Sequence, residues 1–238
     1  MVVARDIDPG IDSDLMMMWL ADARLPTGAH TQSAGLEAAL NAGLAVALIP
    51  DYIDARLATV VAVEAGAAVV AHRYACAETA APASLAGRLT SVETAWRART
   101  MSPALRETSA LLGRGYLRLL GRLWPESTAV QALSLVARPG RAVVLGVAAA
   151  CCGLSAGRLA RIIGYEDAQT IAAAALKLCP LDPVDVSRWA IIAAPAIASM
   201  ADRVTDLTDP ADIPASAAPL IEQWAQVHAT TAQRLFRG

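Results

Sequence analysis

One stretch of the chain decides the fold class: residues 102–125 read SPALRETSALLGRGYLRLLGRLWP. Ser102 and Pro103 are typical of a helix start, because serine caps the first turn and proline suits the first helical position. A helix ends at Trp124-Pro125, since proline cannot extend it. Between these limits a buried seam is expected along residues that step by three or four, namely Leu105, Ser109, Leu112, Tyr116, Leu119 and Leu123.

The same spacing recurs along the rest of the chain, while strict alternation of apolar and polar residues is almost nowhere sustained. We therefore predict an all-α protein, a single-domain bundle of about ten helices with a loosely attached C-terminal tail. Residues 1–13 are expected to be flexible, 14–205 to form the helical domain, and 206–238 to form a connector and a partner-docking tail. Besides the helix above, helices are expected over residues 51–76, 85–99, 127–137 and 167–178. Further helices are expected to begin at Ala142 and at Asp182-Pro183, and a short one to end at Gly164. A loop is expected over 79–86 and an amphipathic tail over 221–236.

Composition excludes several classes of protein. The 238 residues are 55% hydrophobic and 18% charged with a net charge of −2, so the chain can bury a large core and is not disordered. The near-neutral charge gives no basic footprint for nucleic acid. The uncharged runs Ala142–Gly157 and Trp189–Ala201 are shorter than the about 20 residues of a membrane span, and glycines or Pro195 interrupt them. Both are expected to be buried helices, so we predict no membrane insertion. The acidic residues near the N-terminus do not resemble a signal peptide, and a cytoplasmic protein is expected.

Motifs for catalysis and metal binding are absent from the sequence. Lys177, the only lysine, is followed by Leu178, so the chain lacks the Gly-Lys-Ser/Thr of a P-loop. Ser33 is not expected to be the catalytic serine of a hydrolase, because no histidine and acid partners for it can be identified in the sequence. Neither the histidines nor the cysteines have the spacing of zinc ligands, and each is expected to be structural; they are His30, His72 and His228, with Cys76, Cys151, Cys152 and Cys179.

Three further hypotheses stay open at this point. Arginines 114, 118 and 122 recur every four residues and form either a solvated helix face or a ridge for an acidic partner. Two functions are possible for the helical domain. It either binds other proteins, or it is a ligand-binding or enzyme domain with an apolar cavity lined by Cys151, Cys152 and Tyr165. Peripheral membrane association through the tail is weaker, because the tail lacks a strong basic face.

A second stretch identifies a family: residues 20–37 read LADARLPTGAHTQSAGLE. Physically it is a helix end, a Pro-x-Gly turn and a new helix, whose start at Gly35 allows close approach of another chain segment. The string resembles the signature of the UreF family of urease accessory proteins, Leu-Pro-x-Gly-x-x-x-x-Ser-x-Gly-Leu-Glu. The residues in register are Leu25, Pro26, Gly28, Ser33, Gly35, Leu36 and Glu37.

Two more segments agree with this resemblance. Arg106, Ser109, Gly113 and Arg114 match an Arg-x-x-Ser-x-x-x-Gly-Arg pattern of the family, and residues 172–181 resemble its alanine-rich helix ending in Pro-Leu. Other positions depart from the family. After Leu181 only the acid at Asp185 is retained, Gly140-Arg141 stands where a histidine is usual, and His30 replaces an aromatic residue. These departures indicate a divergent branch.

The resemblance implies a non-enzymatic, dimeric scaffold that bridges the UreD accessory protein, also called UreH, and the GTPase UreG, so that nickel reaches apo-urease. No cofactor is expected to bind stably, because nickel and GTP are handled by the partners. At an exposed corner Glu37, with Gly35 and Ser33, is expected to contact the GTPase, Arg106 and Arg114 to support the dimer or the same surface, and Leu235 and Phe236 to dock on UreD. The other expected partner-binding residues are Pro26, Gly28, Leu36, Ser109, Gly113 and Asp185.

Overall fold

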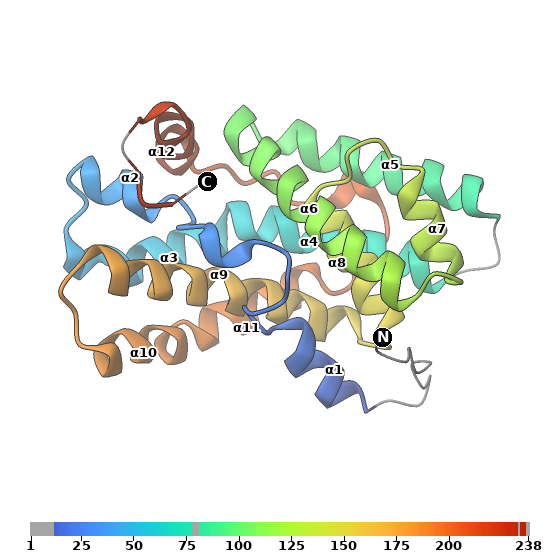
Figure 1. Ribbon diagram of the computed structural model, residues 1–238, viewed down its shortest axis with the longest axis horizontal. Coiled ribbons are helices and arrows are strands. Elements are labelled where there is room, and N and C mark those ends of the chain that lie inside the picture. The colour runs from blue at the N-terminus through green and yellow to red at the C-terminus, as the bar shows by residue number, and fades with distance from the viewer. Residues whose placement is uncertain (1–11, 78–80, 233, 237–238) are drawn as a thin grey trace, which may run out of the picture.

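Helices make up all the regular structure in the computed structural model, which describes residues 12–77, 81–232 and 234–236 (Figure 1). Within these residues there is no strand, so the predicted all-α class is confirmed. Of the segment 1–13 expected to be flexible, residues 1–11 lie outside the described part of the chain.

The described residues form twelve α-helices and three short 3-10 helices, against the about ten helices expected. The helices are α1 Ser13–Leu20, η1 Ala29–Thr31, α2 Leu36–Asn41, η2 Val46–Leu48, α3 Ile49–Ala58, α4 Val60–Cys76, α5 Pro82–Arg99, α6 Pro103–Leu123, α7 Thr128–Ser134, α8 Arg141–Cys151, α9 Ala156–Leu178, α10 Pro183–Ile192, α11 Ala194–Val204, η3 Pro210–Asp212 and α12 Pro219–Thr230.

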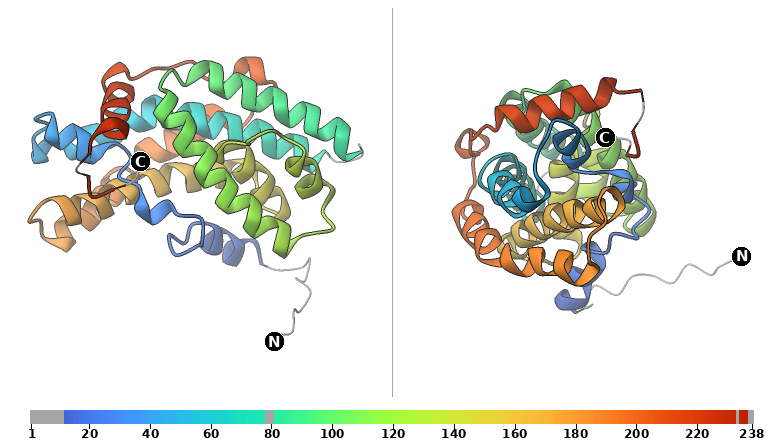
Figure 2. Two further views of the ribbon diagram at one scale, coloured as in Figure 1. Left: turned by 45° about the horizontal axis from the view of Figure 1, so that its top comes forward. Right: turned by 90° about the vertical axis from the view of Figure 1, so that its left-hand side faces the viewer.

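Helix α4 runs through the middle of the bundle, with α5 and α6 on one side and α9 and α11 on the other (Figures 1 and 2). Helix α8 packs closely along it. A Cβ atom built on Gly146 of α8 would lie 2.4 Å from the carbonyl oxygen of Ala68 in α4, so only glycine permits this approach. Residues 142–149 are all buried, which confirms the predicted buried helix for the first part of the run Ala142–Gly157; the helix ends at Cys151, and Gly153 and Ser155 beyond it are exposed.

Three predicted boundaries are wrong. The helix expected over 51–76 is two helices, because the backbone at Thr59, with φ −124° and ψ −100°, interrupts it. Gly164 does not end a helix but lies inside α9, where its missing side chain makes room for Ile197 and Met200 of α11. The loop expected over 79–86 gives way to α5 from Pro82, since proline is favoured in the first turn of a helix.

Helices α10 and α11 are less buried than predicted. Ile191 and Ile192 are 74% and 60% exposed, although the run Trp189–Ala201 was predicted to be buried. By length and composition alone, the segment Pro183–Val204 is the one part of the described chain apolar enough to cross a membrane. This is weak evidence for a span, because helices of soluble proteins meet the same criterion.

The C-terminal region packs against the body of the protein. Helix α12 contacts α2 and α6, and Figure 2 shows it lying across the end of the bundle. His228 on α12 is 2% exposed and Phe236 beyond it is 4% exposed. The described part of the tail is therefore held by buried contacts and is not loosely attached as predicted.

Candidate functional site

The signature loop between α1 and α2 depends on two glycines with left-handed backbone. Gly28 has φ +89° and precedes η1, and Gly35 has φ +79° and precedes α2. The Tyr52 hydroxyl donates to the Ala34 carbonyl at 2.7 Å, and a Cβ atom on Gly35 would lie 3.0 Å from that hydroxyl oxygen. The close approach predicted at Gly35 is thus confirmed, and its partner is the side chain of Tyr52.

Glu37 is not exposed as predicted but buried, with 6% of its surface accessible. Its carboxylate is 2.8 Å from His228 Nε2 and accepts hydrogen bonds from the backbone N–H groups of Leu235 at 2.6 Å and Phe236 at 3.0 Å. We call Glu37 and these three partners the tail clamp. The prediction of an exposed corner at Glu37, Gly35 and Ser33 is wrong, because Gly35 and Ser33 are also buried and the tail covers the glutamate.

The tail clamp keeps Glu37 ionised in spite of its burial. Burial alone would raise the pKa of this carboxyl, but the hydrogen bonds from Leu235, His228 and Phe236 outweigh it and lower the pKa below the usual 4.5. A carboxylate that accepts backbone N–H groups binds them more strongly than a neutral acceptor does. Glu37 therefore acts as an ionic anchor between α2 and the C-terminal segment.

Only part of the signature loop reaches the surface. Pro26 is exposed and Gly28 is half-buried, whereas Leu36 is fully buried. The intervening Thr27 is buried against α6, where a Cβ atom on Gly115 would lie 2.6 Å from the Thr27 carbonyl oxygen. The loop is thus fixed to α6, and among its family-matching residues only Pro26 is exposed.

The α6 residues that match the family hold the molecule together internally. The Ser109 hydroxyl accepts from the backbone N–H of Arg141, the first residue of α8, at 2.9 Å. A Cβ atom on Gly113 would lie 2.2 Å from the Pro139 carbonyl oxygen, so α6 and the start of α8 are in backbone contact. Arg106 donates to the Thr100 carbonyl at 2.6 Å and so closes the turn between α5 and α6.

Arg114 is the exception within this pattern, because it is exposed and its side chain forms no hydrogen bond or ion pair within the described residues. Asp185 is also exposed, on α10, where it pairs with Arg188 at 3.5 Å. On the tail Leu235 is 62% exposed, while Phe236 is buried. The structure thus brings Glu37, Leu235 and Phe236 together, and places Arg114 and Asp185 on separate surfaces.

Two buried ion networks were not predicted. Arg141 donates to Glu64 Oε1 at 2.6 Å and to Glu166 Oε2 at 2.5 Å, which joins α8 to α4 and α9. Arg56 on α3 donates to Asp167 Oδ1 on α9 at 2.6 Å. One feature of the sequence could have indicated a buried charge. Glu64 is the only charged residue in the apolar run VVAVEAGAAVV, residues 60–70, and glutamate is rarely buried without a partner.

These networks line a cavity of about 640 Å³ that is bounded by the signature loop, α6, α9 and α12. Tyr165 and Glu166 lie on its wall, as does His30 from the loop. Cys151 and Cys152 are not among the lining residues, so the cavity proposed in the alternative hypothesis is not formed as expected. Burial raises the pKa of the Cys152 thiol to about 12, which leaves it protonated at neutral pH and unsuited to act as a nucleophile.

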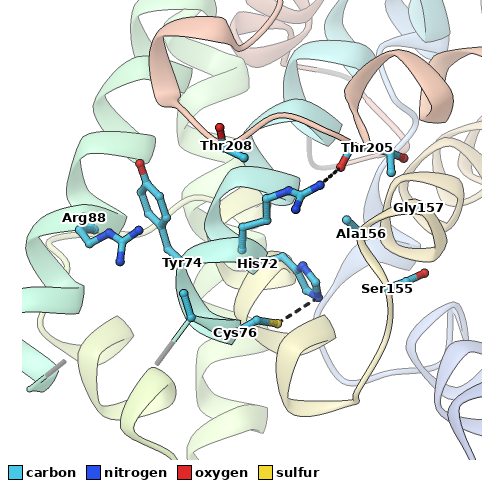
Figure 3. Close-up of a pocket in the computed structure, with 11 residues that line it drawn as sticks. His72, Tyr74, Cys76, Arg88, Ser155, Ala156, Gly157, Thr205 and Thr208 are labelled. Carbon is cyan, nitrogen blue, oxygen red and sulfur yellow. Dashed lines mark hydrogen bonds between the residues drawn. The ribbon is translucent and has the colours of Figure 1, made fainter. Parts of the chain in front are cut away.

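A second cavity of about 760 Å³ opens at the C-terminal end of α4 (Figure 3). His72 Nε2 lies 2.8 Å from the Leu154 carbonyl oxygen and 3.4 Å from Cys76 Sγ, and burial lowers the pKa of the imidazole. Arg73 donates to the Thr205 carbonyl at 2.6 Å. The described residues contain no group of three or more His, Cys, Asp or Glu side chains arranged to hold a metal ion.

Comparison with known proteins agrees with the motif analysis. The UreF family model matches residues 46–191. A urease accessory protein UreF of Mycolicibacterium vanbaalenii is 36% identical over 226 residues, which cover 92% of this chain and 96% of that protein. The urease accessory proteins UreF of Mycobacterium marinum and Mycobacterium tuberculosis are each 34% identical over 227 residues, covering 93% of this chain and 97% of theirs.

Proposed function

The chain belongs to the UreF family of urease accessory proteins, a family of accessory proteins and not of enzymes, and from this premise we propose that it is a scaffold in urease maturation. In this proposal it joins the UreG GTPase to the UreD/UreH accessory protein, so that nickel is inserted into apo-urease. The observation that carries the proposal is the similarity to UreF proteins along more than nine-tenths of the chain.

The structure supports a division of labour among the signature residues. Glu37, Gly35, Ser109 and Gly113 form internal contacts, so they position surfaces and do not contact partners directly. The exposed turn around Pro26 and Gly28 is our candidate for the GTPase contact. The signature is thereby explained as the part of the fold that holds this turn and the tail in place.

The end of the tail is our candidate for the UreD/UreH contact. The clamp fixes the backbone at residue 235 through Glu37, while the Leu235 side chain points outward with 62% of its surface exposed. Because the backbone is already anchored, binding of this leucine to an apolar pocket would not carry the entropy cost of ordering the segment. Phe236 is buried, so in this proposal it does not touch the partner but helps to hold the tail against the body of the protein.

We propose that the protein works as a homodimer in the cytoplasm, independently of nucleic acid and membranes. The face of α10 that carries Asp185 is the candidate dimer surface, since Val184, Ile191 and Ile192 are all at least 60% exposed there. Several large exposed apolar side chains on one short helix are typical of protein interfaces. Nickel and GTP are assigned to the partners, and no cofactor is assigned to this chain.

Activation of urease in cells tests the proposed function. We expect the wild-type chain to restore urease activity to a strain that lacks its own UreF. Leu235→Asp should reduce that activity at least about fivefold, because a charge would be placed in an apolar contact worth about 1–3 kcal/mol. Leu135→Asp is the matched control, since Leu135 is 60% exposed on a different surface, and it should retain activity. Failure of the wild-type chain to restore any activity would contradict the proposal.

A further inference from the structure

Three arginines in the C-terminal two-thirds of α6 differ from every other cation that the structure describes. Arg114, Arg118 and Arg122 are exposed, and within the described residues their side chains form no ion pair, hydrogen bond or ring contact. The other described arginines each have a partner: an acid, as for Arg161 with Asp202, a carbonyl, as for Arg99, a hydroxyl, or an aromatic ring. Even Lys177 lies over the ring of Phe236.

The three arginines also lie close enough to repel one another. Residues four apart on a helix are neighbours on one face, and like charges at that spacing destabilise a helix by about 0.2–0.5 kcal/mol per pair. Two such pairs, 114 with 118 and 118 with 122, occur in succession on α6. An acid at one of these positions would relieve this repulsion, and α10 shows such an arrangement, where Asp185 lies 3.5 Å from Arg188.

A groove adjoins these arginines and adds an apolar element. It has a volume of about 520 Å³ and is lined by Thr27, Leu111, Arg114, Gly115, Leu117 and Arg118. Leu111, which is 48% exposed, falls on the same side of α6 as the arginines, because seven residues are about two helical turns. Figure 1 shows α6 on the outside of the bundle, and Leu111, Arg114, Arg118 and Arg122 are all exposed.

We propose that this arginine face of α6, residues 111–122, binds an acidic amphipathic segment of another protein. Charge complementarity identifies the partner: three cations about 6 Å apart along the helix axis match carboxylates at positions i, i+4 and i+8 of a partner helix. An aliphatic side chain of that segment enters the groove at Leu111 and Leu117. No aromatic residue lines the groove on which a nucleic-acid base could stack, and the chain as a whole carries a charge of −2.

This inference goes beyond the proposed function, which assigns no role to the arginine face. It can be tested with the chain and a peptide alone, without urease or another accessory protein. The probe is a fluorescent helical peptide with glutamates at i, i+4 and i+8 and leucines beside them, and fluorescence anisotropy measures its binding to the full chain. We expect saturable binding that weakens as salt is raised. The triple variant Arg114→Gln/Arg118→Gln/Arg122→Gln should bind at least about tenfold more weakly, since three exposed ion pairs are lost.

Matched controls separate this face from general electrostatics. The variant Arg88→Gln/Arg161→Gln/Arg203→Gln removes the same charge from exposed positions on α5, α9 and α11 and should bind like the wild type. Thermal unfolding of the α6 variant should occur at the same or a higher temperature, because like-charge repulsion is relieved, so weaker binding would not reflect unfolding. Leu111→Ser should also weaken binding.

Three results would overturn the proposal. The first is equal loss of binding in the two triple variants, which would show attraction without a site. The second is equal binding of a peptide with lysines in place of the glutamates. The third is tighter binding of a single-stranded oligonucleotide that depends on the same arginines, which would assign the face to nucleic acid and not to a polypeptide.

Discussion

At the scale of single residues, Glu37 is expected to contribute most to holding the tail. Replacing it by alanine leaves the His228 ring and two backbone N–H groups without an acceptor in a buried place. We expect Glu37→Ala to lower the free energy of unfolding by about 2–4 kcal/mol, since hydrogen bonds to charged groups contribute about 1.5–3 kcal/mol each and are not additive. Urea denaturation measures this, and limited proteolysis should show cleavage near residue 230 before the body unfolds.

The control for this variant is Glu126→Ala, which removes an exposed carboxylate with no ion pair in the described residues. It should change stability by less than about 0.5 kcal/mol. Equal stability of the Glu37→Ala protein and the wild type would refute the anchoring role of Glu37.

The lowered pKa of Glu37 makes its contribution depend on pH. Because the folded state holds this carboxyl ionised below the usual pKa of 4.5, the contribution is complete at neutral pH and is lost as the pH falls through the lowered pKa. We expect the difference in unfolding free energy between the wild type and Glu37→Gln to shrink as the pH falls below about 4.5. A difference that grows on acidification would contradict this assignment.

Sequence reasoning identified Glu37 and misjudged its surroundings. The signature pattern singles out the residue, but its partners His228 and Phe236 lie 191 and 199 positions further along the chain. No periodicity connects residues so far apart, so the burial of Glu37 could be learned only from the tertiary fold. Gly35 is different, because the demand for a small residue at a helix start is local and was predicted correctly.

At the scale of helices, the approach of α6 to α8 can be tested with two glycines on one helix. In Gly113→Ala the new methyl group would lie 2.2 Å from the Pro139 carbonyl oxygen, and we expect a loss of about 1–3 kcal/mol of stability as the two helices are forced apart. Gly121 has open space around it, so Gly121→Ala should stabilise the protein by about 0.5–1 kcal/mol through helix propensity. Thermal unfolding of both variants gives the comparison, and a destabilisation equal in both would refute the close approach.

The helices were predictable to the extent that their signals are local. The extent of α6 was predicted to within a residue, because Ser102 caps it, Pro103 opens it and Pro125 follows it. Gly164 was misread as a helix end, since its function is to admit side chains of α11, which its own neighbourhood does not reveal. The division at Thr59 likewise has no proline or glycine beside it.

At the scale of the whole molecule, the fold class and the family were accessible from sequence, and the arrangement of the binding surfaces was not. The tail was expected to detach, yet its anchor draws Phe236 into the body and leaves Leu235 outside. Ser109 and Gly113 were expected to contact partners, yet they contact the start of α8. Family signatures thus identify residues that the fold requires as well as residues that partners meet.

The central claim, that this chain joins the GTPase to the second accessory protein, is tested most directly by the assembly of purified proteins. Size-exclusion chromatography with light scattering would follow mixtures of the chain with UreG and UreD/UreH from the same organism. We predict a single species that contains all three, and no association of UreG with UreD/UreH when the chain is omitted. Assembly of those two proteins without it, or elution of the chain by itself in the full mixture, would contradict the account.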